Sequence, residues 1–172
     1  MTITVNNMPL RAAFRILVFG TMLSCSAAIG YSQAKDVKVG QVGPFTIHSI
    51  SEKGKFNRCA ATMDPGPKML RIAWNREHIY TVSVPTAPKD PKKPYTMTIS
   101  FGKNGFYKAE AKADGNRSWV AVDIKSVEQL MKVRNQFVVD LGPAHYVWNI
   151  GNVPMEDVLA KVEDCVFKAA GR

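Results

Sequence analysis

The chain has 172 residues, of which 46% are hydrophobic and 22% are charged. Its 23 lysine and arginine residues against 14 acidic ones give a formal net charge of +9. This length allows one domain with a buried core. The basic excess would favour nucleic-acid binding in a cytosolic protein, but the export signal described next excludes nucleic acid as the partner.

The N-terminal segment has the composition of a secretory signal peptide. Arg11 and Arg15 supply its positive charge, and the 15 residues from Ile16 to Gly30 are mostly apolar. Small residues stand at positions −3 and −1 of a cleavage site that ends at Ala34. The apolar stretch is shorter than the roughly 20 residues that a membrane-spanning helix needs. We expect a mature chain of residues 35–172 without a transmembrane helix, in the periplasm or secreted.

Export leaves the mature chain basic, because two basic residues and no acidic ones precede residue 35. The resulting net charge is +7. The expected partners are therefore an anionic glycan, a lipid headgroup or an acidic protein.

The first half of the mature chain predicts short strands separated by turns. Apolar residues alternate between turn signals such as Gly43-Pro44. Four prolines then recur every third residue, which favours a stiff polyproline II connection or a ligand for an aromatic groove. The predicted strands cover residues 45–50, 56–62, 68–74 and 79–84, after a short lead-in at 37–42, and the prolines are Pro85, Pro88, Pro91 and Pro94.

Residues 95–124 predict a three-stranded antiparallel unit with alternating apolar residues. In its first hairpin, a three-residue loop that ends at Gly105 sets Ile99 opposite Ala109. This register keeps one face apolar, and a slip of one residue would destroy it.

Two helices and two further strands complete the predicted domain. Ser126 opens a capping box, and a short helix follows to about Arg134. Strands are predicted at 137–141 and 146–150, and a final helix begins at Met155 with apolar residues at helical spacing. We predict an α+β domain whose mostly antiparallel, meandering sheet of about seven to eight strands has both helices packed on one face.

Cys59 and Cys165 remain after cleavage, and Cys25 is lost. An even pair in an oxidising compartment is typical of a disulfide. Cys59 lies on a predicted strand and Cys165 on the apolar stripe of the final helix, so the bond would pin the helix to the sheet. The alternative is a cysteine nucleophile paired with a histidine, but no histidine lies near either cysteine in the sequence.

The sequence lacks the short motifs of common hydrolases, nucleotide-binding proteins and metalloproteases. Its three histidines are 30 and 67 residues apart, which is not the short spacing of metal ligands. We expect no metal, no cofactor and no enzymatic activity. The alternative is a small secreted hydrolase whose site is assembled from distant residues, such as His145 with Asp140.

One surface of the predicted sheet indicates binding. A four-residue loop in the second hairpin sets Trp119 opposite Lys112 and Asp123 opposite Lys108 on the outer face. A tryptophan beside basic residues can stack a sugar ring or meet an acidic partner. The alternative is that another segment covers Trp119 and makes this a second core face. The candidate ligand-binding residues are Trp119, Lys112, Arg117, Lys108, Thr96 and Thr98.

The order of elements is a signal peptide, a cysteine-bearing strand, the segment Tyr80–Pro85 (YTVSVP), sheet hairpins and Trp148–Gly151 (WNIG) before the final helix. This layout resembles small exported alphaproteobacterial proteins of the invasion-associated locus B type. Those proteins usually carry more cysteines and an early tryptophan-containing strand, which here is Pro44–Ile47. The resemblance implies a periplasmic or surface role in host contact and assigns no catalytic residue.

Overall fold

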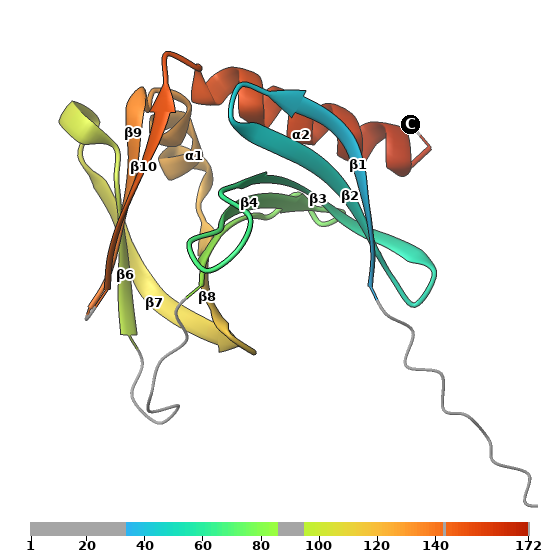
Figure 1. Ribbon diagram of the computed structural model, residues 1–172, viewed down its shortest axis with the longest axis horizontal. Coiled ribbons are helices and arrows are strands. Elements are labelled where there is room, and N and C mark those ends of the chain that lie inside the picture. Colours follow the sequence, from blue (N-terminus) through green and yellow to red (C-terminus); the bar gives the residue numbers. More distant parts are fainter. Residues whose placement is uncertain (1–33, 86–94, 143, 172) are drawn as a thin grey trace, which may run out of the picture. The chain divides into compact units, whose positions relative to one another are not determined.

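A computed structural model describes residues 34–85, 95–142 and 144–171. They form a sheet of ten strands with two helices and one short 3-10 turn (Figure 1). The predicted signal peptide before Ala34 lies outside the described residues. Three of the four regularly spaced prolines, Pro88, Pro91 and Pro94, also lie outside them.

Every strand is antiparallel to its neighbours, in the order β1-β2-β3-β4-β5-β8-β7-β6-β9-β10. This confirms a mostly antiparallel sheet with two helices, but the ten strands exceed the predicted number. The strands are β1 (Lys35–Val42), β2 (Phe45–Glu52), β3 (Lys55–Met63), β4 (Leu70–Asn75), β5 (Tyr80–Val84), β6 (Tyr95–Ser100), β7 (Phe106–Asp114), β8 (Arg117–Val122), β9 (Asn135–Leu141) and β10 (Ala144–Gly151).

Strand β1 covers the segment that the sequence predicts only as a lead-in. Its side chains are mostly exposed, so no buried face marks it in the sequence, and its pairing with β2 holds it in place. Gly43 in the following turn has φ +54°, and a Cβ atom there would lie 2.2 Å from Cγ2 of Val153. This turn therefore requires glycine.

Helix α1 (Ile124–Met131) begins before the predicted capping box. Asp123 is its N-cap, because the carboxylate accepts hydrogen bonds from the backbone N of Ser126 at 3.0 Å and from its Oγ at 2.8 Å. These hydrogen bonds lower the pKa of Asp123. Strand β8 ends at Val122, so the cross-strand pair expected between Asp123 and Lys108 does not form.

Helix α2 (Met155–Ala169) begins directly after Pro154, as predicted. It packs on β1 to β4 and against α1 (Figure 1). Glu156 and Asp157 stand in its first turn, where negative charge is favourable. Its buried residues belong to the same hydrophobic cluster as the inner face of the sheet: Met155, Val158, Leu159, Val162, Cys165 and Val166.

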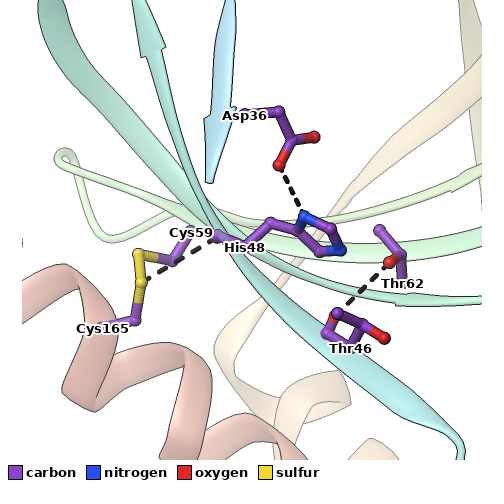
Figure 2. A network of polar contacts seen from close by, with 6 residues as sticks. All are labelled: Asp36, Thr46, His48, Cys59, Thr62 and Cys165. Carbon is purple, nitrogen blue, oxygen red and sulfur yellow. Dashed lines mark hydrogen bonds and ion pairs between the residues drawn. A yellow bond between two sulfur atoms is a disulfide. The ribbon is translucent and has the colours of Figure 1, made fainter. Parts of the chain in front are cut away.

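The predicted disulfide is confirmed. Cys59 on β3 and Cys165 on α2 are bonded across 106 residues, and their Cα atoms are 6.0 Å apart (Figure 2). This separation lies in the ordinary range for a disulfide. The bond joins the final helix to the inner face of the sheet.

The first hairpin of the predicted three-stranded unit has a different register. Ile99 lies opposite Tyr107 rather than opposite Ala109. The cause is a 3-10 turn at Gly102–Asn104, which lengthens the loop beyond three residues. Because the register differs by two residues, each side chain keeps its predicted face.

The second hairpin confirms that Trp119 lies opposite Lys112. Its loop is shorter than predicted, because Asp114 and Arg117 are themselves paired. Pairing between β7 and β8 is restricted to this end of the two strands. Beyond it, β7 pairs with β6, so the second half of the sheet diverges from the first (Figure 1).

Strand β10 is tied to the connection between β3 and β4. The Nε1 atom of Trp148 donates a hydrogen bond to the carbonyl oxygen of Lys68 at 2.8 Å. The Trp148 side chain is 2% exposed and packs edge-on against Phe137 and in a stack with Tyr146. The buried core of the inner face therefore extends from α2 to this edge strand.

Candidate functional site

A hollow of about 260 Å³ lies on the outer face of the sheet, over β3, β4, β5 and β8. Arg71 lies opposite Ser83, and Ser83 lies opposite Trp119. Residues directly opposite each other in an antiparallel sheet point to the same face. The residues that line the hollow are Asn57, Arg58, Arg71, Ala73, Asn75, Thr81, Ser83, Asp114, Arg117 and Trp119.

Small side chains form the floor of the hollow. Ala73 lines it and is 3% exposed, and Ala60, opposite Ala73 on β3, is fully buried. Arg58 precedes Ala60 by two positions and Arg71 precedes Ala73 by two, so long side chains flank short ones on the same face. The depression follows from this alternation of long and short residues.

Arg71 contributes a hydrogen-bond donor without an acceptor. Its Nε atom is buried and has no hydrogen-bond partner among the described residues. Burial lowers the pKa of Arg71, the charge of Arg58 lowers it further, and Asp36 acts in the opposite direction. A buried N–H group without a partner is costly to the folded state. Among the described residues, the folded chain therefore supplies no acceptor for this buried N–H group.

Arg117 is fixed in position by neutral acceptors. Its Nη2 atom donates to the carbonyl oxygens of Met69 at 2.9 Å and Ser83 at 2.8 Å. Burial and the charge of Arg71 lower the pKa of Arg117 to about 10. These carbonyl groups orient the guanidinium but do not cancel its positive charge.

Arg58 is the one arginine of the hollow that forms an ion pair within the described part of the chain. Its Nη1 atom lies 3.2 Å from Oε1 of Glu52, and the two side chains are 33% and 44% exposed. Asn57 accepts a hydrogen bond from Arg58 and donates one to Glu52. Among the described residues, Asp114 is the single carboxylate that lines the hollow. Three arginines and this one carboxylate line the hollow, while Glu52 and Asp36 act on Arg58 and Arg71 from beside it.

Trp119 is half-buried and lines the hollow. Lys112 is exposed, and its Nζ atom lies 5.2 Å from the centre of the Trp119 ring, within reach of a cation–π contact. Among the described residues, Trp119 therefore lies at the wall of an open depression rather than in a second closed core.

The structure brings together half of the predicted binding residues. Trp119 and Arg117 line the hollow, and Lys112 contacts Trp119. Thr98 lies opposite Lys108 on β6 and β7, and neither residue lines the hollow, nor does Thr96.

Arg58 and Arg71 are the site residues that the sequence analysis missed. Arg58 directly precedes the buried Cys59 and Ala60, and Arg71 stands between the buried Leu70 and Ile72. A charged residue in the middle of a buried strand is the signal that could have identified Arg71.

His145 and Asp140, the pair named for a hydrolase, lie opposite each other on β10 and β9. Nδ1 of His145 is hydrogen-bonded to Oδ1 of Asp140, and the side chains are 61% and 52% exposed. His48 forms a similar pair with Asp36 at 2.6 Å, on β2 and β1 (Figure 2). Neither histidine lines the hollow.

A second hollow lies at the ends of β6, β9 and β10 and contains a different arginine. Its volume is about 780 Å³, and its lining is mostly amide and small residues. Nη1 of Arg134 donates to the carbonyl oxygens of Met131 at 2.7 Å and Val133 at 2.9 Å. These hydrogen bonds hold Arg134 at the C-terminal end of α1. Among the described residues, Arg134 is the one arginine that lines the second hollow, whereas three line the first.

The described residues contain no group of three or more histidine, cysteine, aspartate or glutamate side chains placed to hold a metal ion. Within the same residues, no helix has the length and apolar character needed to cross a membrane. Comparisons with protein-family models, with curated proteins and with solved structures give no match. The likeness to the invasion-associated locus B type therefore rests on the order of elements in the sequence.

Proposed function

We propose that the mature chain is an exported, non-enzymatic binding protein that takes up an anionic group of its partner between Arg58, Arg71 and Arg117. The observation that carries this proposal is the buried Nε atom of Arg71, which has no hydrogen-bond partner among the described residues and belongs to a hollow lined by two further arginines. An anion at this position supplies the missing acceptor and offsets the mutual repulsion of the guanidinium groups.

The disulfide supports a location outside the cytoplasm, because such bonds persist in oxidising compartments. An anionic glycan, a lipid headgroup or an acidic protein would each present a suitable group. The order of elements resembles that of proteins of the invasion-associated locus B type, which favours contact with a host as the occasion for such binding.

The alternative function, a small secreted hydrolase, has the His145–Asp140 hydrogen bond in its favour. Both side chains are more than half exposed on the sheet face, whereas general acid–base catalysis works best in a site that holds the substrate. The arginine-lined hollow is partly enclosed, but none of its lining residues is a histidine. The geometry therefore favours binding.

The test is calorimetric titration of acetate and sulfate into the wild-type protein and into Arg71→Met. Charge-assisted hydrogen bonds contribute about 1.5–3 kcal/mol, so the variant should bind at least about tenfold more weakly. The matched control is Lys108→Met, which removes the same charge from the outer face away from the hollow and should leave affinity unchanged. Equal losses in the two variants, or no anion binding by the wild type, would contradict the proposal.

Glu52→Gln provides a change in the opposite direction. It removes the carboxylate that pairs with Arg58 and preserves the shape of the side chain. Acetate and sulfate should then bind a few-fold more tightly, because Arg58 no longer has a competing anion. An unchanged affinity would exclude Arg58 from the binding site.

A further inference from the structure

We infer that the anionic group is the carboxylate of a sugar acid, and that one hexuronic acid residue fills the hollow with its ring against Trp119. This inference rests on the proposed anion binding. It adds a ligand class that the arginines alone do not specify.

The first argument is size. The hollow has a volume of about 260 Å³, and a water molecule takes up about 30 Å³ in the liquid, so roughly nine waters would fill it. A lone sulfate or phosphate would leave most of this space to water. One sugar ring with its hydroxyl groups would displace more of this water than such an ion does.

The second argument is the mixture of donors and acceptors around the arginines. Asp114 lines the hollow, and an ionised carboxylate only accepts hydrogen bonds. It therefore repels a bare multivalent anion but accepts from the hydroxyl groups of a sugar. Asn57, Asn75, Thr81 and Ser83 add amide and hydroxyl groups that can both donate and accept.

The third argument is the shape of the charged group. A guanidinium presents its N–H donors in a planar fork that matches the two oxygens of a carboxylate. Arg71 lines the hollow, and its guanidinium is such a fork. A carboxylate lying beside Arg71 can therefore accept hydrogen bonds from it, with Arg58 and Arg117 contributing charge at the same hollow.

The fourth argument is the aromatic wall. Trp119 is half-buried, lines the hollow and is held in place next to Lys112. An indole offers a large rigid apolar surface at little entropic cost, and the C–H face of a pyranose ring is apolar. Trp119 on β8 and Arg71 on β4 both lie opposite Ser83 of β5. A sugar ring stacked on Trp119 can therefore place its carboxylate beside Arg71.

The experiment compares four probes on the full, disulfide-bonded protein at one pH and ionic strength: glucuronate, glucose, acetate and sulfate. Two-dimensional NMR of the indole N–H groups and calorimetry provide the readouts. Glucuronate should bind at least about tenfold more tightly than acetate and than glucose, with a shift of the Trp119 signal. If acetate and sulfate bind as tightly as glucuronate, the sugar-acid inference fails and anion binding remains. If none of the charged probes binds, the proposed function fails.

Two variants separate the ring from the charge. Trp119→Leu should reduce glucuronate affinity to that of acetate and leave acetate affinity unchanged. Asp114→Asn should strengthen sulfate binding, because it removes repulsion, and weaken glucuronate binding, because it removes an acceptor for hydroxyl groups. The inference would be overturned if Trp119→Leu changed glucuronate and acetate affinity by the same factor. It would also be overturned if Asp114→Asn changed glucuronate and sulfate affinity in the same direction. Because Asp114 is exposed at a hairpin, the second variant remains informative if the first fails to fold.

Discussion

The outer face of the sheet has two regions that differ in how far their polar and charged groups are paired. Over β3, β4, β5 and β8, three arginines surround a hollow, and Arg71 keeps a buried donor without a partner among the described residues. Over β6, β9 and β10, His145 pairs with Asp140, and Arg134 is bound to backbone carbonyl groups. In the first region a buried N–H donor lacks an acceptor among the described residues, whereas in the second His145, Asp140 and Arg134 are hydrogen-bonded within the chain. In a basic protein, the unmet interaction marks the candidate site better than the number of positive charges.

The largest expected effect concerns the disulfide beneath the first region. Cys59→Ala with Cys165→Ala should lower the free energy of unfolding by about 2–5 kcal/mol, because the bond closes a long loop. Denaturant unfolding measures the loss. Since α2 packs on β1 to β4, amide exchange should increase in β2 and β3 before β9 and β10. A uniform increase across both regions would show that the disulfide does not act locally.

The second prediction separates stability from binding in the hollow. Arg71→Met keeps an apolar side chain of similar length and removes the unpartnered donor, so the free energy of unfolding should rise by about 1 kcal/mol. The same variant loses anion binding. Thermal unfolding without ligand measures the gain. A marked loss of stability would mean that Arg71 has a structural role, and would contradict the prediction.

The third prediction concerns pH. Burial and the charge of Arg71 lower the pKa of Arg117 to about 10. Around and above this pH the unfolded chain binds more protons at this residue, so the contribution of Arg117 to stability rises with pH, while anion affinity falls as the charge is lost. Acetate affinity measured on either side of about pH 10, with the Arg117 guanidinium carbon followed by NMR, tests this. A guanidinium that stays protonated throughout would contradict it.

Periodicity and composition predict the order and class of elements well, but they do not fix the details that depend on pairing. The helix from Met155 and the Cys59–Cys165 bond follow from an apolar stripe and a cysteine count. Strand β1 was missed because its side chains are exposed. The first hairpin differs from its predicted register by two residues. Such a shift keeps every side chain on its face of the sheet, so the apolar pattern fits both registers equally well.

The candidate site was only half predictable for a related reason. Trp119, Arg117 and Lys112 are close in the chain and on one hairpin, so local register brings them together. Arg58 and Arg71 join them through β3, β4 and β5, whose order in the sheet cannot be derived from alternation alone. Thr96, Thr98 and Lys108 were grouped with Trp119 because the predicted pairing of β7 with β8 was too long.

The smallest expected effect is in the second region. Asp140→Asn preserves the size of the side chain and weakens its pair with His145. Both side chains of this pair are more than half exposed. Exposed ion pairs contribute about 0–1 kcal/mol, so the free energy of unfolding should change by less than about 1 kcal/mol, and anion affinity should not change. Thermal unfolding and acetate titration provide the measurements. If Asp140→Asn instead abolished a hydrolytic activity of the wild-type protein while leaving its stability intact, the pair would be catalytic. The satisfied region would then be the functional one, and the unpartnered donor of Arg71 would mark the wrong region of the outer face.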